Sequence, residues 1–340
     1  MLKPRLEIRF DIRRQAHFLF GKPYRPGQCE FMLNQSRSGI FLALRSIDLP
    51  RGSRVGVMIY NCHTVMNAVK QSGCEPVFID VTDEMMLDFD DLKRKVNDLS
   101  ALVVTHLFGI VNDVKAIKNE FPNLIVIEDC AHAYGIEHLY GDFATFSIGQ
   151  GKLPSIGDGG LLFVINERFK GKIAETYETL PNYSFLQSVI LFFRLCMASF
   201  LHRPWLYGWL TNSIKKYRKP SSACDIVRPM KMCKGVSSVY AREKDLIALQ
   251  IGNRMRNATR MTELVGSIGL KEFHMGFNAF MLVVRCDNPS ILQKELANRG
   301  VDSATHFANS ILWATEFGYI SGQCPNAEKM IKQLLMVPVY

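Results

Sequence analysis

The chain has 340 residues, of which 48% are hydrophobic and 21% charged, and its formal net charge is +9. This profile is typical of a globular protein with a large core, long enough for two domains or for one large α/β domain with an appendage. The positive charge favours an anionic ligand or surface, or is simply a solvated basic face. The densest basic run, at 215–219, is short and no long stripe of basic and aromatic residues appears, which argues against nucleic acid as a partner.

Nine cysteines are scattered along the chain, and none forms a Cys-x-x-Cys pair. The pattern is typical of reduced thiols in a cytosolic protein and not of a disulfide framework or a zinc site, so we expect no metal. The N-terminal stretch mixes charged and apolar residues and lacks the apolar core of a signal peptide. The sequence therefore predicts a cytoplasmic protein.

From residue 36 to 165 the sequence alternates between helical and strand patterns. Strands are expected at 53–60, 75–81, 101–109, 123–129, 142–148 and 159–165, and helices at 38–49, 64–73, 87–98 and 113–122. The strands are short apolar runs bounded by turn residues, which is typical of buried, mainly parallel strands. In such a βαβ array, ligand-binding groups lie at the carboxyl ends of strands. Asp129 and His106 occupy such positions, and Ser147 and Lys152 lie on or just beyond another strand.

An apolar segment spans residues 184–210, with Arg194 inside it. A transmembrane helix needs about 20 largely uncharged residues, so Arg194 argues against one. Two interpretations remain. The segment is either a buried helix followed by a loop, or an interfacial segment on a membrane, with Trp205, Tyr207 and Trp209 near the headgroups.

The remainder of the chain predicts an α+β unit. A loop is expected at 219–229, a long helix at 240–265, a strand at 278–286, a helix at 288–300, a strand or loop at 301–307 and a last helix at 326–340. We therefore expect a large α/β domain at residues 1–235 and a smaller α+β domain at 236–340.

Lys152 lies among glycines in the stretch GQGKLPSIGDGG, residues 149–160. Most loop lysines are surface residues, but partial desolvation or a neighbouring cation lowers the pKa of the amine and makes it a nucleophile toward carbonyl carbon. The flanking glycines allow the backbone to approach a ligand closely. Taken alone, Lys152 leaves both interpretations open.

Asp129 favours the functional interpretation, because a buried carboxylate needs a cationic or hydrogen-bonding partner. A partner that fits is the protonated pyridine nitrogen of pyridoxal phosphate, whose aldehyde a lysine holds. His132 could stack on the same ring or bond to it, or is a core histidine. Glu128 points to the other face of its strand and is expected at the surface.

The phosphate of such a cofactor needs anion-binding groups. Ser147 lies five residues before Lys152 and could reach it with its hydroxyl group. Residues 34–41, NQSRSGIF, offer backbone amides and serine hydroxyls at a helix N-terminus, which favours an anion. Serine-rich helix starts are mostly plain N-caps, so this motif is weak by itself.

Six stretches carry a resemblance to a known family. They are SRSGIFLAL, CHTVMNAVKQSGCEPVFIDV, THLFG, IEDCAHAYG, GDFATFSIGQGKLPSIGDGGLLFV and CPNAEKMIKQLLMVPVY. In order and spacing they resemble the DegT/StrS-type nucleotide-sugar aminotransferases, fold type I pyridoxal-phosphate enzymes that aminate keto sugars carried on nucleotides. The resemblance runs from residue 25 to 340, is strongest over 55–165 and is poor over 175–230.

The resemblance implies a role for each residue of the core motif. Lys152 matches the lysine that holds pyridoxal 5′-phosphate as a covalent aldimine and later moves a proton. Asp129 matches the partner of the pyridinium nitrogen. His132 matches the position beside the ring, and Ser147 matches a phosphate ligand.

Five further positions follow from the same resemblance. Arg37 and Ser38 match the phosphate loop, where the backbone matters more than the side chain. Cys62 stands near the position of the aromatic residue that usually stacks on the ring, with His63 next to it. His63 and His106 are candidate substrate contacts, and His106 is alternatively a structural residue.

The sequence also departs from the family pattern. The asparagine that the partner subunit usually contributes to the phosphate has no match at 228–240, and the chain ends at residue 340, where the family continues into another helix. The second domain is therefore expected to be truncated. Lysine at position 152 fits the amino-transferring branch better than the dehydratase branch, which carries histidine there.

The resemblance implies a mainly parallel seven-stranded sheet flanked by helices, a homodimer, and transfer of an amino group from an amino acid, expected to be glutamate, to a keto sugar nucleotide. The setting would be surface polysaccharide or amino-sugar biosynthesis. Two alternatives remain open. One is a sugar dehydratase or isomerase that uses the same cofactor. The other is a catalytically degenerate relative that docks on a membrane-bound glycan-assembly complex through 184–210.

Overall fold

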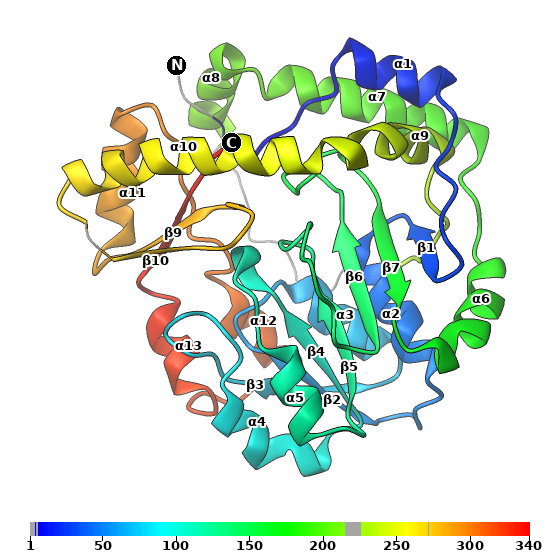
Figure 1. The fold of residues 1–340 in the computed structure, drawn as a ribbon. Helices are drawn as coiled ribbons and strands as arrows, with labels where there is room; N and C mark the ends of the chain where they lie inside the picture. The colour runs from blue at the N-terminus through cyan, green and yellow to red at the C-terminus, as the bar shows by residue number, and fades with distance from the viewer. Residues whose placement is uncertain (1–3, 5, 215–225, 271) are drawn as a thin grey trace.

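The computed structural model describes residues 4, 6–214, 226–270 and 272–340 (Figure 1). The basic run at 215–219 and most of the loop expected at 219–229 lie outside these residues, as does Cys224. The eight cysteines that the structure describes are all free thiols, and half of them are buried. Figure 1 shows one large sheet with helices on both of its faces and a smaller sheet beside it.

The large sheet has seven strands in the order β1-β7-β6-β5-β4-β2-β3. The strands are β1 (Glu30–Leu33), β2 (Arg54–Met58), β3 (Glu75–Ile79), β4 (Ala101–Thr105), β5 (Ile125–Asp129), β6 (Phe143–Ser147) and β7 (Gly160–Val164). Strands β2 to β6 pair in parallel, whereas β7 is antiparallel to both β6 and β1. The mainly parallel sheet and its predicted strands are thereby confirmed. Only β1 is not predicted, because four residues carry no periodic signal.

Thirteen α-helices surround the sheets among the described residues. They are α1 (Ile12–Phe20), α2 (Ser36–Ser46), α3 (His63–Gln71), α4 (Phe89–Lys95), α5 (Val114–Glu120), α6 (Lys170–Glu178), α7 (Phe185–Leu201), α8 (Pro204–Ile214), α9 (Lys234–Glu243), α10 (Ile247–Ser267), α11 (Pro289–Asn298), α12 (Ser310–Thr315) and α13 (Pro325–Met330). Helix α4 begins where the Asp88 carboxylate accepts a hydrogen bond from Asp91 N, and α5 begins in the same way at Asp113. These side chains satisfy backbone N–H groups that have no partner inside the helix.

The two faces of the sheet are covered by different helices. Helices α2, α3 and α6 pack on one face, against alternate strand residues such as Val57 and Ile127. The other face packs partly against α5 and the small sheet, through residues such as Leu102 and Val126. The rest of that face packs against α1, α7 and α9, where Phe146 of β6 is buried. Because both faces are covered, the strands consist of nearly continuous apolar runs.

The small sheet has the order β10-β9-β8, with all pairs antiparallel. Its strands are β8 (Phe273–Met275), β9 (Leu282–Arg285) and β10 (Leu334–Val337). The last helix predicted at 326–340 is therefore wrong, because α13 ends at Met330 and β10 follows. All four residues of β10 are buried, and a short run covered on both faces has no alternation that separates it from a buried helix.

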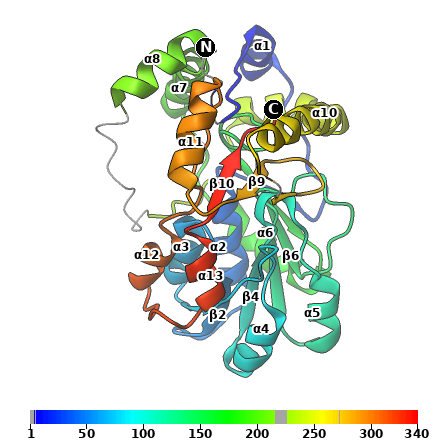
Figure 2. The ribbon, with the colours of Figure 1, turned by 90° about the vertical axis from the view of Figure 1, so that its left-hand side faces the viewer.

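The boundary between residues 235 and 236 stays a prediction. Side chains on both sides of it share one hydrophobic cluster, in which Phe280 and Met336 join Met58 and Val104. The small sheet therefore packs directly on the large one, which Figure 2 shows from the side.

Residues 184–210 form two helices, α7 and α8, with one break between them. Helix α7 begins with a capping box in which Ser184 and Gln187 satisfy each other's backbone N–H groups. Only Leu191 and Leu195 of α7 are buried, so the interpretation as a buried helix followed by a loop is wrong. Within the described ranges, none of the helices has both the length and the apolarity that a bilayer crossing requires.

We predict that Leu335→Ala lowers the free energy of unfolding by about 2–5 kcal/mol, because the side chain is fully buried in β10 between the small sheet and α10 and α11. Urea unfolding followed by circular dichroism measures this difference. The matched control is Ile320→Ala, whose side chain is 67% exposed. If Leu335→Ala lowers the free energy of unfolding no more than the control does, the assignment of β10 as a buried strand is contradicted.

Candidate functional site

A cavity of about 470 Å³ lies where the parallel strands of the large sheet end. The cavity is lined by the segment after β2, by the ends of β4, β5 and β6 with the loops that follow them, and by the start of α2. The lining residues include Asn61, Cys62, Thr105, Asp129, His132, Ser147, Gly149, Lys152, Gln35, Ser36 and Arg37. The carboxyl ends of neighbouring parallel strands meet at one edge of a sheet, so the fold brings these distant segments together.

Lys152 lies in the loop between β6 and β7, and its side chain is half-buried in the wall of the cavity. Among the described residues, its ammonium group has no hydrogen-bonding or ionic partner, and the aromatic ring of Phe280 lies 5.7 Å away. Burial lowers the pKa of the Lys152 amine below its ordinary value of 10.5, and Asp129 and Cys62 oppose this shift. An amine in this state is closer to its neutral, nucleophilic form than a surface lysine is.

The lysine loop passes so close to its neighbours that it requires glycine. A Cβ atom at Gly157 would lie 2.4 Å from Leu195 of α7, and the φ of Gly157 is +110°. A Cβ atom at Gly160 would lie 2.2 Å from Ser36 N, at the start of α2. Glycine at these two positions therefore lets α7 and the N-terminus of α2 border the cavity.

Asp129 ends β5, and its side chain is almost completely buried. Its carboxylate accepts hydrogen bonds from Ala131 N at 3.1 Å and from Thr105 Oγ1 at 3.4 Å. Burial raises the pKa of Asp129, and these two donors and the charge of Lys152 oppose it. No cation of the described chain lies within 4 Å of the carboxylate, so its position fits a cationic group of a ligand.

His132 packs flat among aromatic rings beside the cavity. Its ring is stacked on Phe280 at 4.3 Å and on Phe307 at 5.8 Å between centroids. Its Nδ1 accepts a hydrogen bond from Phe108 N, so the neutral ring carries its proton on Nε2. Burial and the charge of Lys152 hold the pKa of His132 well below its usual range, which keeps the imidazole neutral.

The anion-binding groups gather at the N-terminus of α2. Ser147 Oγ and the first residues of this 11-residue helix line the same end of the cavity. The Arg37 guanidinium donates to Gln35 Oε1 at 2.5 Å. Ser38 does not line the cavity, because its buried hydroxyl donates to Asn34 Oδ1 at 2.9 Å. The helix N-terminus, where unpaired N–H groups and the helix dipole attract negative charge, is the main electrostatic feature of this end.

Cys62 lines the cavity, but His63 does not. Burial raises the pKa of the Cys62 thiol, while hydrogen bonds with His63 and Thr64 outweigh burial and lower it overall. Thr64 Oγ1 donates to Cys62 Sγ at 3.1 Å. The His63 ring is buried against Trp313 at 4.7 Å between centroids, and this packing gives it no position at the cavity wall.

His106 is fully buried outside the cavity and bonds to Glu128. Its Nδ1 accepts from Asn112 N at 3.1 Å, so Nε2 carries the proton and donates to Glu128 Oε2 at 2.9 Å. The other carboxylate oxygen accepts from Tyr140 N and Gly141 N. The expectation that Glu128 is exposed is wrong, because these three donors satisfy it inside the protein. From the sequence, His106 is expected to be either a substrate contact or a structural residue, and this geometry favours the structural role.

Cys130 lies beside this pair, so that ligand atoms of His106, Glu128 and Cys130 fall within 4.8 Å of one another. Both ring nitrogens of His106 are already occupied by hydrogen bonds, and burial raises the pKa of the Cys130 thiol well above its usual value. The cluster therefore has the protonation states of a hydrogen-bonded core and not those of metal ligands.

The cavity has further wall residues that the sequence pattern does not single out. Asn61 Nδ2 donates to Thr105 Oγ1 at 2.7 Å and connects the ends of β2 and β4. His306 and Phe307 come from the loop before α12, and Phe307 has a φ of +56°, which is rare for a residue with a side chain. No local signal predicts these two, because their neighbours in space lie far away in the sequence.

Arg194 of α7 also reaches the cavity and pairs with Asp158 there, at 3.4 Å. The same carboxylate accepts from Tyr183 Oη at 3.0 Å. In the sequence, Arg194 is only a charge inside an apolar segment. The structure shows that α7 carries this charge to the rim of the cavity.

Comparisons with known proteins agree with this fold. Residues 32–186 match the sequence model of the DegT/DnrJ/EryC1/StrS aminotransferase family. GDP-perosamine synthase of Escherichia coli O157:H7 is 32% identical over 139 residues, which cover 38% of this chain and 38% of that protein. The dTDP-4-dehydro-2,3,6-trideoxy-D-glucose 4-aminotransferase of Saccharopolyspora spinosa is 30% identical over 44% of this chain and 41% of its own length. The chain thus matches less than half the length of these relatives.

Solved structures resemble the chain over nearly its whole length. The aminotransferase TlmJ from Streptoalloteichus hindustanus has a TM-score of 0.76 and 16% identity over 100% of this chain and 94% of its own. The "putative sugar aminotransferase" Spr1654 from Streptococcus pneumoniae, in its PLP form, has a TM-score of 0.75 and 14% identity, with the same coverage.

At this level of identity the solved structures show the fold alone. Residues 32–186, which carry most of the strands and loops around the cavity, are similar to the DegT/DnrJ/EryC1/StrS aminotransferase family.

Proposed function

We propose that the protein is a pyridoxal-phosphate-dependent aminotransferase that moves an amino group from an amino acid to a keto sugar nucleotide. The observation that carries the proposal is that one cavity holds both the Lys152 amine and the buried Asp129 carboxylate. Among the described residues, the amine has no hydrogen-bonding or ionic partner, and the carboxylate has only neutral donors. The names of relatives such as GDP-perosamine synthase and the dTDP-4-dehydro-2,3,6-trideoxy-D-glucose 4-aminotransferase supply the substrate class. Glutamate as amino donor, and a setting in polysaccharide or amino-sugar biosynthesis, are part of the proposal.

The donor set fits pyridoxal phosphate. Lys152 would hold the aldehyde, Asp129 the ring nitrogen and His132 the ring edge. Ser147 and the N-terminus of α2 would hold the phosphate. Arg37 lies in this first turn of α2. When bound, this group supplies an electron sink for the negative charge that develops at the carbon losing its proton.

The chain's own residues set the proton chemistry. Lys152 Nζ, whose amine has a lowered pKa, is the base that takes the proton from the substrate carbon. The Asp129 carboxylate would favour the protonated ring nitrogen when the cofactor is bound, because a cation beside it removes the cost of burying its negative charge. The neutral His132 can donate its Nε2 proton without placing a second positive charge beside Lys152.

Cys62 is the residue that bears on the two alternative functions, a dehydratase and a catalytically degenerate relative. The thiol occupies a wall position where the resemblance leads one to expect a stacking aromatic ring. A catalytically degenerate relative or a dehydratase would also tolerate this change. Product analysis separates the dehydratase from the aminotransferase, and the spectroscopic test below separates the degenerate relative from both.

We predict that pyridoxal phosphate added to the protein gives a visible absorbance band that Lys152→Ala abolishes, and that borohydride traps the cofactor covalently on the peptide containing Lys152. The matched control is Lys170→Ala, an amine that bonds to Gln28 far from the cavity. Addition of glutamate should shift the band in the wild-type protein. If wild-type protein and Lys152→Ala have the same spectrum, the enzyme proposal fails.

We predict that Asp129→Asn lowers turnover by roughly 10²–10³-fold, because the amide keeps the shape but cannot compensate a protonated ring nitrogen. Steady-state amination of a keto sugar nucleotide measures the change. Asp287→Asn, an exposed position, serves as the control. Unchanged turnover in Asp129→Asn would show that the carboxylate has no electrostatic role.

We also propose that the protein is a homodimer that rests on an anionic membrane surface through α1, α7 and α8. Large apolar side chains of these helices are exposed: Ile12, Leu19, Phe20, Phe185, Leu186, Ile190, Phe193, Met197, Phe200, Trp205 and Trp209. The stretches 12–25 and 184–214 contain no Asp or Glu but several basic residues. Exposed apolar and aromatic groups in stretches whose only charges are positive suit an interface with anionic lipids.

Tyr207 does not fit the interfacial interpretation, which places it near the headgroups together with Trp205 and Trp209. It is buried, and its hydroxyl donates to Asp302 at 2.7 Å. It therefore anchors α8 to the body of the protein and is not available to lipid.

We predict that the protein floats with phosphatidylglycerol vesicles and that Ile190→Glu/Met197→Glu weakens this binding about tenfold or more for each lost apolar contact. The control, Ile291→Glu/Ile320→Glu, changes two side chains that are at least as exposed, on α11 and after α12. Light scattering should show a dimer for all three proteins. A protein that never floats contradicts the membrane proposal, and a variant that becomes monomeric shows that a second copy covers this face.

A further inference from the structure

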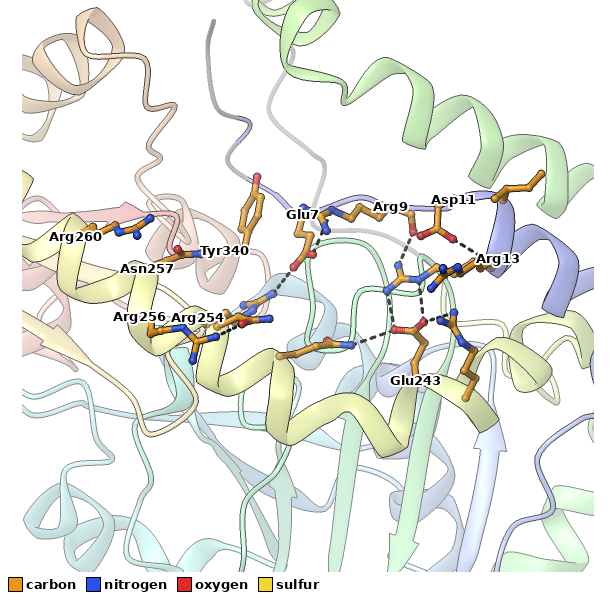
Figure 3. A pocket seen from close by; sticks show the side chains of 15 residues that line it. Glu7, Arg9, Asp11, Arg13, Glu243, Arg254, Arg256, Asn257, Arg260 and Tyr340 are labelled. Carbon is orange, nitrogen blue, oxygen red and sulfur yellow. Dashed lines mark hydrogen bonds and ion pairs between the residues drawn. The ribbon is translucent and has the colours of Figure 1, made fainter.

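A second cavity, of about 630 Å³, lies between the N-terminal segment and helix α10 (Figure 3). Seven arginines line it, together with only three carboxylates, which leaves an excess of four positive charges. The arginines are Arg9, Arg13, Arg14, Arg242, Arg254, Arg256 and Arg260, and the carboxylates are Glu7, Asp11 and Glu243. We call this cavity the arginine groove.

Two of the arginines are structural. Arg14 forms a two-pronged pair with Glu243, with contacts of 2.9 and 3.3 Å, and Arg254 pairs with Glu7 at 3.0 Å. The side chains of Arg14, Glu243 and Arg254 are almost completely buried, so these pairs form the floor of the groove. Their donors are already used, and they are not available to a ligand.

The floor also separates the groove from the candidate active site. Arg14 Nη1 donates to the carbonyl of Ser155 at 2.7 Å, and Arg254 Nη2 donates to the carbonyl of Lys152 at 3.4 Å. The groove therefore lies behind the lysine loop, on the side away from the Lys152 amine. It is a separate site that shares a wall with the first one.

Three guanidinium groups at the rim of the groove have no ion-pair partner in the described part of the chain. Within the described ranges, no carboxylate lies within 4 Å of the guanidinium groups of Arg13, Arg256 or Arg260. Asp11 accepts from Arg14 N, which caps α1. Arg256 donates to Asn253 Oδ1, a neutral partner. A protein that leaves three planar cationic forks on one groove has a strong local attraction for anions.

The spacing along α10 directs these side chains to one place. Asn253, Arg256, Asn257 and Arg260 are three or four residues apart, so they occupy one face of the helix. Figure 3 shows Asn257 and Arg260 of this helix on one side of the groove, and Arg9 and Arg13 of the N-terminal segment on the other. Two arginines four residues apart repel each other when nothing lies between them, and an anion in the groove removes this repulsion.

We infer that the arginine groove binds a phosphate-bearing anion, with its phosphate or diphosphate oxygens on the forks of Arg256 and Arg260. Phosphate groups match the planar guanidinium fork, which offers two parallel N–H donors. This inference is independent of the proposed enzymatic function, because no rim residue lines the Lys152 cavity.

The phosphate has two possible sources that share this chemistry. A third cavity, of about 780 Å³, adjoins the groove through Glu7, Arg9 and Tyr340 and reaches Phe10 and Phe200, so an apolar tail could follow the phosphate toward α7. A lipid headgroup would use both cavities, whereas a soluble phosphate ligand would use the arginine groove alone.

The test is calorimetric titration of the full chain with inorganic pyrophosphate at low salt. Arg256→Gln/Arg260→Gln should weaken binding by about tenfold or more for each arginine, because charge-assisted hydrogen bonds are lost. Both side chains are exposed, so the variant is expected to fold. Arg45→Gln/Arg51→Gln removes the same charge elsewhere on the surface and should bind as the wild type does.

A second pair of variants excludes binding at the other cavity. Arg37→Gln/Ser147→Ala changes the anion-binding end of the Lys152 cavity and should leave the groove's pyrophosphate affinity unchanged. The visible spectrum with pyridoxal phosphate should be the same in Arg256→Gln/Arg260→Gln and in the wild type, so the two proposals can fail separately. Wild-type protein that does not bind pyrophosphate, or binding that Arg256→Gln/Arg260→Gln leaves intact, overturns the inference.

Vesicles identify the source of the phosphate. If Arg256→Gln/Arg260→Gln also loses binding to phosphatidylglycerol vesicles, relative to phosphatidylcholine vesicles and to the Arg45→Gln/Arg51→Gln control, the ligand is a lipid headgroup. If only pyrophosphate binding is lost, the ligand is soluble. Both results support a phosphate site.

Discussion

The parallel pairing of β5 between β4 and β6 is the constraint on which the rest of the site depends. In this register Thr105 lies beside Asp129, and Asp129 lies beside Thr145, two residues before Ser147. The carboxylate, its hydroxyl donor and Ser147, which we propose as a phosphate ligand, are thus brought to one edge of the sheet by backbone hydrogen bonds alone. A shift of one residue in this pairing would turn Asp129 away from the cavity, because successive strand residues face opposite sides.

The same alternation explains how two neighbouring acids come to have different environments. Asp129 faces the cavity with only neutral donors, whereas Glu128 faces the opposite side and is satisfied by His106 and two backbone amides. Glu128 thereby connects the strand end to the loop after His132, and Asp129 retains the capacity to meet a cation. One acid contributes to the fold and the other remains available for chemistry.

The lysine loop is held from two sides. Its front faces the cavity, where Gly157 and Gly160 allow α7 and α2 to approach, and its back is bonded by Arg14 and Arg254. Those arginines belong to the first helix and to the long helix of the C-terminal part, so segments from both ends of the chain position Lys152. Their own charges are neutralised by Glu243 and Glu7, which leaves the neighbouring rim arginines as the uncompensated ones.

Much of this could be predicted from the sequence, because strands buried on both faces and the spacing from Asp129 to Lys152 are local patterns. The sequence by itself determined the βαβ order, the strand-end position of Asp129 and the glycine-rich lysine loop. Only the tertiary structure decided that β10 is a strand, that Glu128 is buried and that α7 exposes its apolar face. It also brought His306, Phe307 and Arg194 to the cavity, and gathered the arginine groove from residues 9–14 and 242–260. The physical reason is that burial, charge compensation and ring stacking depend on neighbours that are distant in the chain, which no local periodicity records.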